Sequence, residues 1–240
     1  MELTGKTAII TGGTKGIGLG IAKAMLQKGM HVMITGRKKA TVNQVVKKLS
    51  EKYEGKIMGH AGDVKDIKSQ RAAVSALKKE WKRLDVLIAN AGVGHFASIE
   101  DLTVKQWNEV IDVNLTGVFN SVKASIPSLK RTQGYIITIA SLAGCNFFAK
   151  GTAYNASKFG LVGFTQAMMM DLRPYDIKCS TIMPGSVATY FNDHKPTKKD
   201  AWKIQPEDIG QMVIDLLQMP ARTLPSKVEV RPSRPPSSRK

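Results

Sequence analysis

Short apolar runs of strand length alternate with longer segments of helical periodicity along this chain, and this alternation constrains the fold most strongly. The runs cover 6–13, 31–37, 56–64, 84–92, 134–141 and 177–185. Strands separated by helices run parallel, because right-handed crossovers return the chain to the same sheet, and helices then cover both faces. The pattern predicts an α/β fold, a doubly wound parallel sheet of the Rossmann type flanked by helices on both faces. A last short strand is expected at 227–230.

The chain length suits one large domain, since 240 residues with 42% apolar content can bury a single sizeable core. We expect one dinucleotide-binding catalytic domain over 1–230 and a flexible basic tail over 231–240, where Pro, Ser and Arg dominate. No signal peptide and no membrane-spanning run is recognised, so a cytoplasmic protein is predicted. Cys145 and Cys179 lie far apart and the histidines lack metal-binding spacing, so neither a disulfide framework nor a metal site is predicted.

The formal net charge of +17 attracts polyanions but specifies no partner. Much of this charge falls on candidate helix faces, where solvated lysines are the ordinary explanation. Nucleic-acid binding is an alternative, but no aromatic platform and no zinc finger accompanies the charge.

The stretch "TGGTKGIG" at 11–18 lies between the first strand and the first helix, the context in which clustered glycines bind phosphates. Gly12, Gly16 and Gly18 permit a tight turn and a close approach of a pyrophosphate to the helix N-terminus. A simple glycine turn is the alternative. The pattern GxxxxGK[ST] is absent, which disfavours ATP.

The end of the second strand predicts the choice of cofactor. Gly36 stands where an acidic residue would bind an adenosine ribose, and Arg37 follows it. Lys15 in the glycine loop and Arg37 are suited to bind a 2′-phosphate together, which predicts NADP(H) in preference to NAD(H). The alternative is that both are surface cations beside a bound NAD.

Tyr154 and Lys158 are four residues apart in a helical segment and therefore share one stripe of that helix. An ammonium at about 4 Å stabilises a phenolate and would lower a phenol pKa from about 10 toward neutrality. Such a tyrosine exchanges protons with a carbonyl or alcohol oxygen. Ser141 at the end of the fifth strand is a candidate hydrogen-bond donor to the same oxygen, and Asn114 a candidate for a proton path. Capping or turn roles are the alternatives for Ser141 and Asn114.

These features together resemble the short-chain dehydrogenase/reductase family. The resemblance extends over about residues 5–230 and rests on motifs in the family's order: "TGGTKGIG", "ANAG" at 89–92, Asn114, Ser141, "YNASK" at 154–158 and "PGSVAT" at 184–189. It implies that Tyr154 is the general acid/base, that Lys158 tunes it and binds the nicotinamide ribose, that Ser141 polarises the carbonyl, and that Asn114 supports a proton relay. Ala89 departs from the family, which often has asparagine there.

The resemblance also implies a cofactor-binding set. Asp63 and Val64 would flank the adenine, and Thr189 would contact the carboxamide. The full set is Gly12, Thr14, Lys15, Gly16, Ile17, Gly18, Arg37, Asp63, Val64, Asn90, Ala91, Gly92, Tyr154, Lys158, Pro184, Gly185, Val187 and Thr189.

The substrate is predicted from the segment after the sixth strand and from aromatic residues. By resemblance, 186–205 is a short lid. A mainly apolar pocket for a hydrophobic ketone or aldehyde is expected to be lined by His95, Phe96, Phe147, Phe148, Tyr190 and Phe191, although such aromatics often belong to a core.

The chain looks most like 3-oxoacyl-acyl carrier protein reductases. Thr132 and Tyr175, however, stand where that group docks its carrier through arginine, with Arg131 and Arg173 adjacent. An NADPH-dependent carbonyl reductase or alcohol dehydrogenase is therefore preferred. A 3-oxoacyl-acyl carrier protein reductase of fatty acid synthesis and a non-catalytic NADP(H)-binding regulatory protein are the alternatives. The resemblance further implies a homotetramer or homodimer built through 105–125 and 154–172.

Overall fold

A single parallel sheet organises the protein in this computed structural model, which describes residues 2–235. Its strands are β1 (Thr7–Ile10), β2 (His31–Gly36), β3 (Ile57–Ala61), β4 (Val86–Ala89), β5 (Tyr135–Ile139), β6 (Lys178–Pro184) and β7 (Lys227–Val230). They lie in the order β3-β2-β1-β4-β5-β6-β7. The order reverses between β1 and β4, so a crevice opens beyond the carboxyl ends of these two strands.

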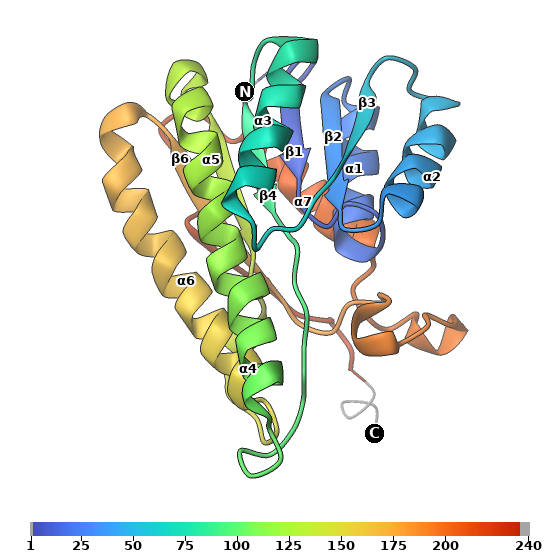
Figure 1. Cartoon of the computed structure of the whole chain (residues 1–240), viewed down its shortest axis with the longest axis vertical. Coiled ribbons are helices and arrows are strands. Elements are labelled where there is room, and N and C mark those ends of the chain that lie inside the picture. Colours follow the sequence, from blue (N-terminus) through green and yellow to red (C-terminus); the bar gives the residue numbers. More distant parts are fainter. Residues whose placement is uncertain (1, 236–240) are drawn as a thin grey trace.

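The helices form two layers around this sheet (Figure 1). They are α1 (Gly16–Gln27), α2 (Lys39–Ser50), α3 (Ile67–Trp81), α4 (Val104–Ile111), α5 (Gly117–Thr132), α6 (Thr152–Leu172) and α7 (Pro206–Gln218). Helices α1, α2 and α7 cover one face, and α3, α5 and α6 cover the other. The predicted doubly wound α/β fold, a single Rossmann-type domain, is confirmed.

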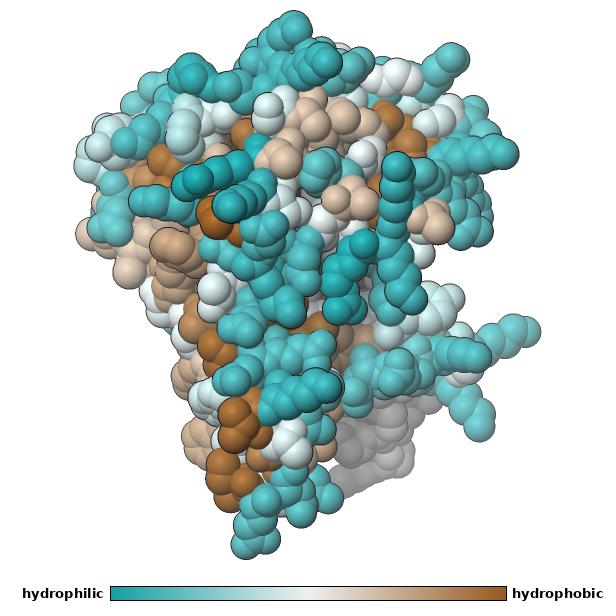
Figure 2. All heavy atoms as spheres, viewed as in Figure 1, coloured by the Kyte–Doolittle hydropathy of each residue, from teal (hydrophilic) through white to brown (hydrophobic). Residues whose placement is uncertain are grey.

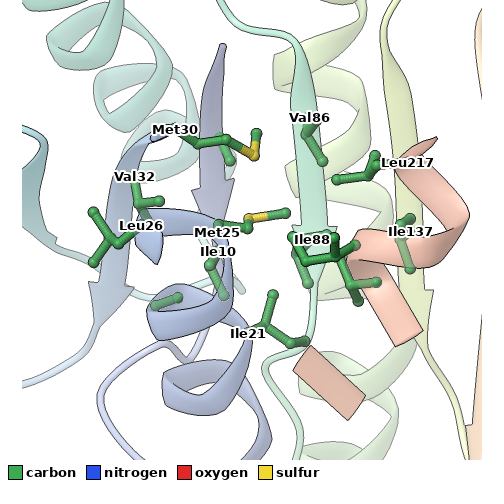
Figure 3. Packing of buried hydrophobic residues seen from close by; sticks show 14 of the residues in the cluster. Ile10, Ile21, Met25, Leu26, Met30, Val32, Val86, Ile88, Ile137 and Leu217 are labelled. Carbon is green, nitrogen blue, oxygen red and sulfur yellow. The ribbon is translucent and has the colours of Figure 1, made fainter. Parts of the chain in front are cut away.

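Alternate residues of the central strands point to opposite layers, as the two-residue period of a strand requires. On β1, Ile10 packs with α1 and α7, whereas Ile9 packs with the layer of α3, α5 and α6. Figure 3 shows Ile10, Ile88 and Ile137 from neighbouring strands meeting Ile21 and Met25 of α1. Burial on both faces explains why these strands read as continuous apolar runs rather than alternating ones.

The described residues include the predicted last strand but only part of the predicted tail. The expected last strand is present as β7, which pairs in parallel with β6. The expected flexible tail over 231–240 lies partly outside the described residues, so its flexibility and the boundary at 230 stay predictions. None of the described helices is long and apolar enough to cross a membrane.

Candidate active site

The glycine loop between β1 and α1 has the backbone geometry that its composition predicts. Gly12 and Gly16 have φ of 65° and 54°, in the left-handed region that side chains disfavour. A Cβ atom on Gly18 would lie 2.5 Å from the Gly12 carbonyl oxygen, so only glycine lets the helix start this close to the loop. The first turn of α1 contains no acidic residue and no side-chain cap, which leaves a positive helix end facing the crevice.

Asn90 fastens this loop to the end of β4. Its Nδ2 donates to the carbonyl oxygens of Thr11 and Gly12 at 2.9 and 3.1 Å. The Thr11 hydroxyl oxygen accepts in return from the backbone N–H groups of Asn90 and Ala91 at 3.0 and 3.1 Å. The amide of Asn90 therefore shapes the loop, a role that the sequence analysis missed.

Two adjoining clefts open at the carboxyl edge of the sheet. The main cleft brings together these predicted cofactor residues: Gly12, Thr14, Lys15, Gly16, Ile17, Arg37, Asp63, Val64, Asn90, Ala91, Gly92, Tyr154, Lys158 and Thr189. The outer cleft is lined by Ser141 and Tyr154, and by the predicted cofactor residues Ile17, Pro184, Gly185, Val187 and Thr189. Gly18 lines neither cleft and lies beneath the loop.

The end of β2 is closely packed at Gly36, the position where an acidic residue would bind a ribose. A Cβ atom on Gly36 would lie 3.0 Å from Cγ2 of Thr14 and 3.2 Å from Cγ2 of Val42. The adjacent Arg37 lines the main cleft, as does Lys15. This end of the cleft therefore presents cations and no carboxylate from β2.

Tyr154 and Lys158 lie in the first two turns of α6, where they meet both clefts. The Lys158 Nζ is 5.7 Å from the centroid of the Tyr154 ring and donates to the Ile139 carbonyl oxygen at 3.0 Å. Lys158 is almost wholly buried, with 4% of its surface exposed. The predicted shared stripe is confirmed, and the amine faces both the ring and the main cleft.

The pKa values of this pair differ from the prediction. Burial raises the pKa of Tyr154 to about 12, and a hydrogen bond from Ser141 acts in the opposite direction. Burial also lowers the pKa of Lys158 to about 8. The predicted lowering of the tyrosine pKa is thus wrong for this structure, because burial penalises the charged form of each group and is the largest cause of both shifts.

Ser141 follows β5 and adjoins Tyr154 at the outer cleft. Its Oγ accepts from the backbone N–H of Ala143 at 3.1 Å and lies 3.4 Å from the Pro184 carbonyl oxygen. The cap that Ser141 gives to a short 3₁₀ turn and its place beside the phenol are therefore compatible. The two interpretations offered by the sequence both hold for its geometry.

Asn114 lies in a π-helical turn, Asp112–Thr116, between α4 and α5. It is fully buried, and its Nδ2 donates to the Val93 carbonyl oxygen and to Ser157 Oγ at 2.9 and 3.0 Å. Its Oδ1 accepts from the Val93 N–H at 2.8 Å. The side chain therefore joins the loop after β4 to α6, and the wider turn, common at functional sites, was not predicted.

Aromatic rings surround Tyr154, but not all those predicted. Phe96 and Phe191 have ring centroids 5.4 and 5.6 Å from that of Tyr154. Phe148 stacks against Phe96 at 6.0 Å, and Tyr190 lines the main cleft.

Four of the six predicted pocket residues line neither cleft: Phe96 and Phe148, which lie near Tyr154, and Phe147 and His95, which lie elsewhere. Phe147 is 87% exposed, because its loop turns this side chain outward. His95 forms a hydrogen bond with Glu109 through Nε2 at 3.0 Å and lines neither cleft, since the imidazole has a charged partner on α4.

The segment predicted as a lid, 186–205, consists of short turns held by one buried carboxylate. Asp200 Oδ2 accepts from the Thr197 N–H at 2.8 Å and lies 3.0 Å from His194 Nε2. Its Oδ1 is 2.7 Å from Lys203 Nζ. Hydrogen bonds from Lys203 and from Thr197 hold the pKa of Asp200 well below its usual range.

Within residues 2–235, no three His, Cys, Asp or Glu side chains gather in a way that would hold a metal ion. The site offers instead a glycine loop, a helix N-terminus and two cations beside an open cleft. Close backbone approach at Gly12 and Gly18 fits a dinucleotide pyrophosphate.

Known oxidoreductases are similar to this chain over nearly its whole length. An uncharacterised oxidoreductase from Staphylococcus saprophyticus is 31% identical over 97% of this chain and 99% of its own. An alcohol dehydrogenase from the archaeon Thermococcus sibiricus, solved in complex with 5-hydroxy-NADP, superposes with a TM-score of 0.90 at 28% identity, covering 96% of this chain and 98% of that one.

A second solved structure is a 3-ketoacyl-(acyl-carrier-protein) reductase from Brucella melitensis in complex with NADH. It superposes with a TM-score of 0.86 at 26% identity, covering 95% of this chain and 97% of that one. The sequence model of the short chain dehydrogenase family matches residues 6–200. With this match and the site geometry together, the chain belongs to the short chain dehydrogenase family of oxidoreductases.

Proposed function

We propose that this protein is an NADPH-dependent carbonyl reductase that also catalyses the reverse oxidation of an alcohol. The observation that carries the proposal is the meeting of Tyr154, Lys158 and Ser141 where the two clefts adjoin. Asn114 supports this group from behind through Ser157.

When bound, the nicotinamide dinucleotide supplies or accepts the hydride. During reduction, Tyr154 Oη donates its proton to the substrate carbonyl oxygen, and the Ser141 hydroxyl donates a hydrogen bond to the same oxygen. A pKa of about 12 keeps the phenol protonated at neutral pH, which suits a proton donor. In the oxidation direction the same oxygen receives the proton.

Lys158 stabilises the phenolate that forms when Tyr154 gives up its proton. Its ammonium is held by the Ile139 carbonyl oxygen and is surrounded by protein, so its charge acts on the ring with little screening by water. Asn114 has both polar atoms engaged within the protein, so it contributes to a proton relay by positioning the loop and helix around Lys158.

The preference for NADP(H) is supported by the end of the main cleft near β2. Arg37 and Lys15 line the cleft there and are suited to bind a 2′-phosphate, and Gly36 offers no carboxylate to a ribose hydroxyl. The residues proposed to contact the rest of the cofactor are those of the two clefts, with Gly18 beneath the pyrophosphate.

The carrier-protein alternative is less well supported by the residues at its expected docking positions. Thr132 donates its hydroxyl to the Leu84 carbonyl oxygen at 2.7 Å. The Tyr175 ring is covered by Lys130, whose Nζ is 3.3 Å from the ring centroid. Both side chains are thus engaged within the protein, and the aromatic wall around Tyr154 favours a small carbonyl compound with an apolar carbon skeleton.

We also propose that the protein works as a homodimer or homotetramer. Helices α4, α5 and α6 expose large apolar side chains, which include Trp107, Phe119, Phe159 and Met170. Figure 2 shows hydrophobic residues gathered along the edge of the molecule that these helices form. Apolar patches of this kind mark protein interfaces.

The proposal is tested by NADPH oxidation across ketones, diketones, aldehydes and an acetoacetyl thioester, with NADH compared in parallel. Tyr154→Phe should retain cofactor affinity and lose at least about a hundredfold in turnover, because the proton donor is gone. A fully active variant would remove Tyr154 from the mechanism. Tight NADPH binding without turnover of any compound would instead support the non-catalytic binding protein.

A further inference from the structure

Two basic side chains from the lid line the outer cleft together with Ser141 and Tyr154. They are His194 and Lys203, and they belong to the segment that follows β6. Among the described residues, no Asp or Glu lines this cleft. An anion that enters the outer cleft therefore meets the Lys203 ammonium, while Asp200, which pairs with Lys203, lies behind the cleft wall.

These two side chains are positioned by Asp200. The carboxylate is buried, with 8% of the side chain exposed, and its two oxygens engage Lys203 Nζ at 2.7 Å and His194 Nε2 at 3.0 Å. Lys203 keeps further N–H groups for another acceptor, and His194 keeps Nδ1, the ring nitrogen that Asp200 does not engage. Asp200 thus orients both groups and leaves each able to bind a second partner.

The donors of this cluster suit an anion with a single charge. The Lys203 ammonium is partly offset by Asp200, and its N–H groups that Asp200 does not engage can donate to the two oxygens of one carboxylate. A phosphate dianion would bring more negative charge than this cluster offsets. The remaining wall of the cleft includes Phe191, which packs on the Tyr154 ring at 5.6 Å and is suited to the carbon skeleton.

We propose that the substrate is an oxo acid, a carbonyl compound whose carboxylate binds His194 and Lys203 while its carbonyl oxygen meets Tyr154 and Ser141. This inference rests on the proposed carbonyl reductase activity and specifies its substrate class. The carboxylate fixes the orientation of the substrate, so the two lid residues determine specificity without taking part in hydride or proton transfer.

The test compares acetoacetate with its uncharged ethyl ester under saturating NADPH. The wild-type protein should have the higher kcat/KM for acetoacetate. Lys203→Met keeps the length of the side chain and removes its charge, and it should lower the ratio of kcat/KM for acetoacetate to that for the ester by about tenfold or more. Lys203→Arg, which restores the charge, should recover most of that ratio. His194→Gln should change the ratio in the same direction as Lys203→Met.

Lys199→Met is the matched control, because Lys199 belongs to the same lid but lines neither cleft. This variant should leave the ratio unchanged. An equal loss for both substrates in Lys203→Met would show that Lys203 only holds the lid, and weaker NADPH binding with an unchanged ratio would assign it to the cofactor; both results overturn the inference. A phosphorylated ketone that outperforms acetoacetate would overturn the assignment to carboxylates.

If the wild-type protein reduces the ester but not acetoacetate, the proposed reductase activity is supported and the assignment of oxo acids as its substrates is refuted. Inactivity toward every carbonyl compound would count against the reductase itself. The two proposals therefore fail separately.

Discussion

Lys158 is the residue whose titration should control activity near neutral pH. Its pKa of about 8 in the folded protein is below the ordinary lysine value of 10.5, because burial penalises the ammonium. Tyr154, with a pKa of about 12, titrates well above this range. A change in rate near pH 8 therefore reports the lysine.

We expect kcat/KM for NADPH, which reports the free enzyme, to fall above pH 8 by about tenfold per pH unit as Lys158 loses its proton.

The stability of the folded protein should instead increase with pH over this range. Between pH 8 and 10.5 the unfolded chain binds the lysine proton and the folded chain does not, so this group makes the free energy of unfolding rise with pH. Both effects should disappear in Lys158→Met, measured by pH–rate profiles and by denaturant unfolding. If the fall of kcat/KM above pH 8 persists in Lys158→Met, another titrating group causes it.

Arg37 is the residue that should decide between the two dinucleotides. Arg37→Asp should weaken NADPH binding at least about tenfold more than NADH binding, because it replaces a phosphate-binding cation by a charge that repels the phosphate. Dissociation constants measured by fluorescence titration check this. Equal losses for both cofactors would contradict a contact with the 2′-phosphate.

At the scale of residues, the sequence is a better guide to which side chains lie together than to their pKa values. Spacing along one helix placed Tyr154 and Lys158 on one stripe, and strand ends brought Ser141 to them. The direction in which the pKa of Tyr154 shifts depends on how much protein surrounds its ring. Segments far away in the sequence supply that surrounding protein. The bond between His95 and Glu109 was missed for the same reason, since it joins a loop to α4.

At the scale of elements, α1 and α7 cross with backbone nearly in contact. A Cβ atom on Gly20 would lie 2.4 Å from the Pro206 carbonyl oxygen, and one on Gly210 would lie 2.8 Å from the Gly20 carbonyl oxygen. This close approach holds α7, which directly follows the lid, against the helix that begins at the glycine loop.

Gly20→Ala should therefore destabilise the protein by about 1–3 kcal/mol, since the added methyl group cannot be accommodated without moving a helix. Gly163→Ala is the control on α6, where a Cβ atom would meet nothing within 4 Å. That substitution should stabilise by about 0.5–1 kcal/mol through helix propensity alone. Urea denaturation midpoints measure both, and destabilisation of equal size would contradict the packing explanation.

Elements with a regular period were predicted well, and irregular ones were not. Every expected apolar run contains a strand, and even the four-residue β7 was found at 227–230. The π-helical turn around Asn114 and the 3₁₀ turns of the lid have no periodic signature. The turn around Asn114 follows from its contact with Val93, a residue whose proximity only the folded chain reveals. The turns of the lid depend on local side-chain contacts of Asp200 with His194 and Lys203, which no period in the sequence marks.

At the scale of the whole molecule, the net charge and the exposed apolar side chains act in opposite directions on association. The net charge of +17 opposes close association of two copies, yet the edge formed by α4, α5 and α6 presents exposed aromatic and methionine side chains. Burial of this edge between copies would offset the repulsion if the contact excludes most of the lysines.

Phe119→Glu should shift the protein from two or four subunits toward the monomer, because it places a charge in the expected interface. Lys48→Glu is the matched control, since it introduces the same carboxylate on α2, which covers the other face of the sheet. Light scattering after size-exclusion chromatography measures the mass of each. A Phe119→Glu protein with the wild-type mass would place the interface elsewhere.

Four hydrogen bonds join Asn90 and Ala91 to Thr11 and Gly12, and all four are made within the protein itself. The glycine loop consequently has little conformational entropy left to lose on association, so coenzyme capture should resemble the docking of a rigid body. The lid is tied differently: backbone hydrogen bonds of Ser186 and Ala188 with Ile204 join its two ends, and its middle consists of short turns around the Asp200 carboxylate. We therefore expect lid opening to be the rate-limiting step of turnover, so that release of the oxidised or reduced nucleotide, and not hydride transfer, determines kcat.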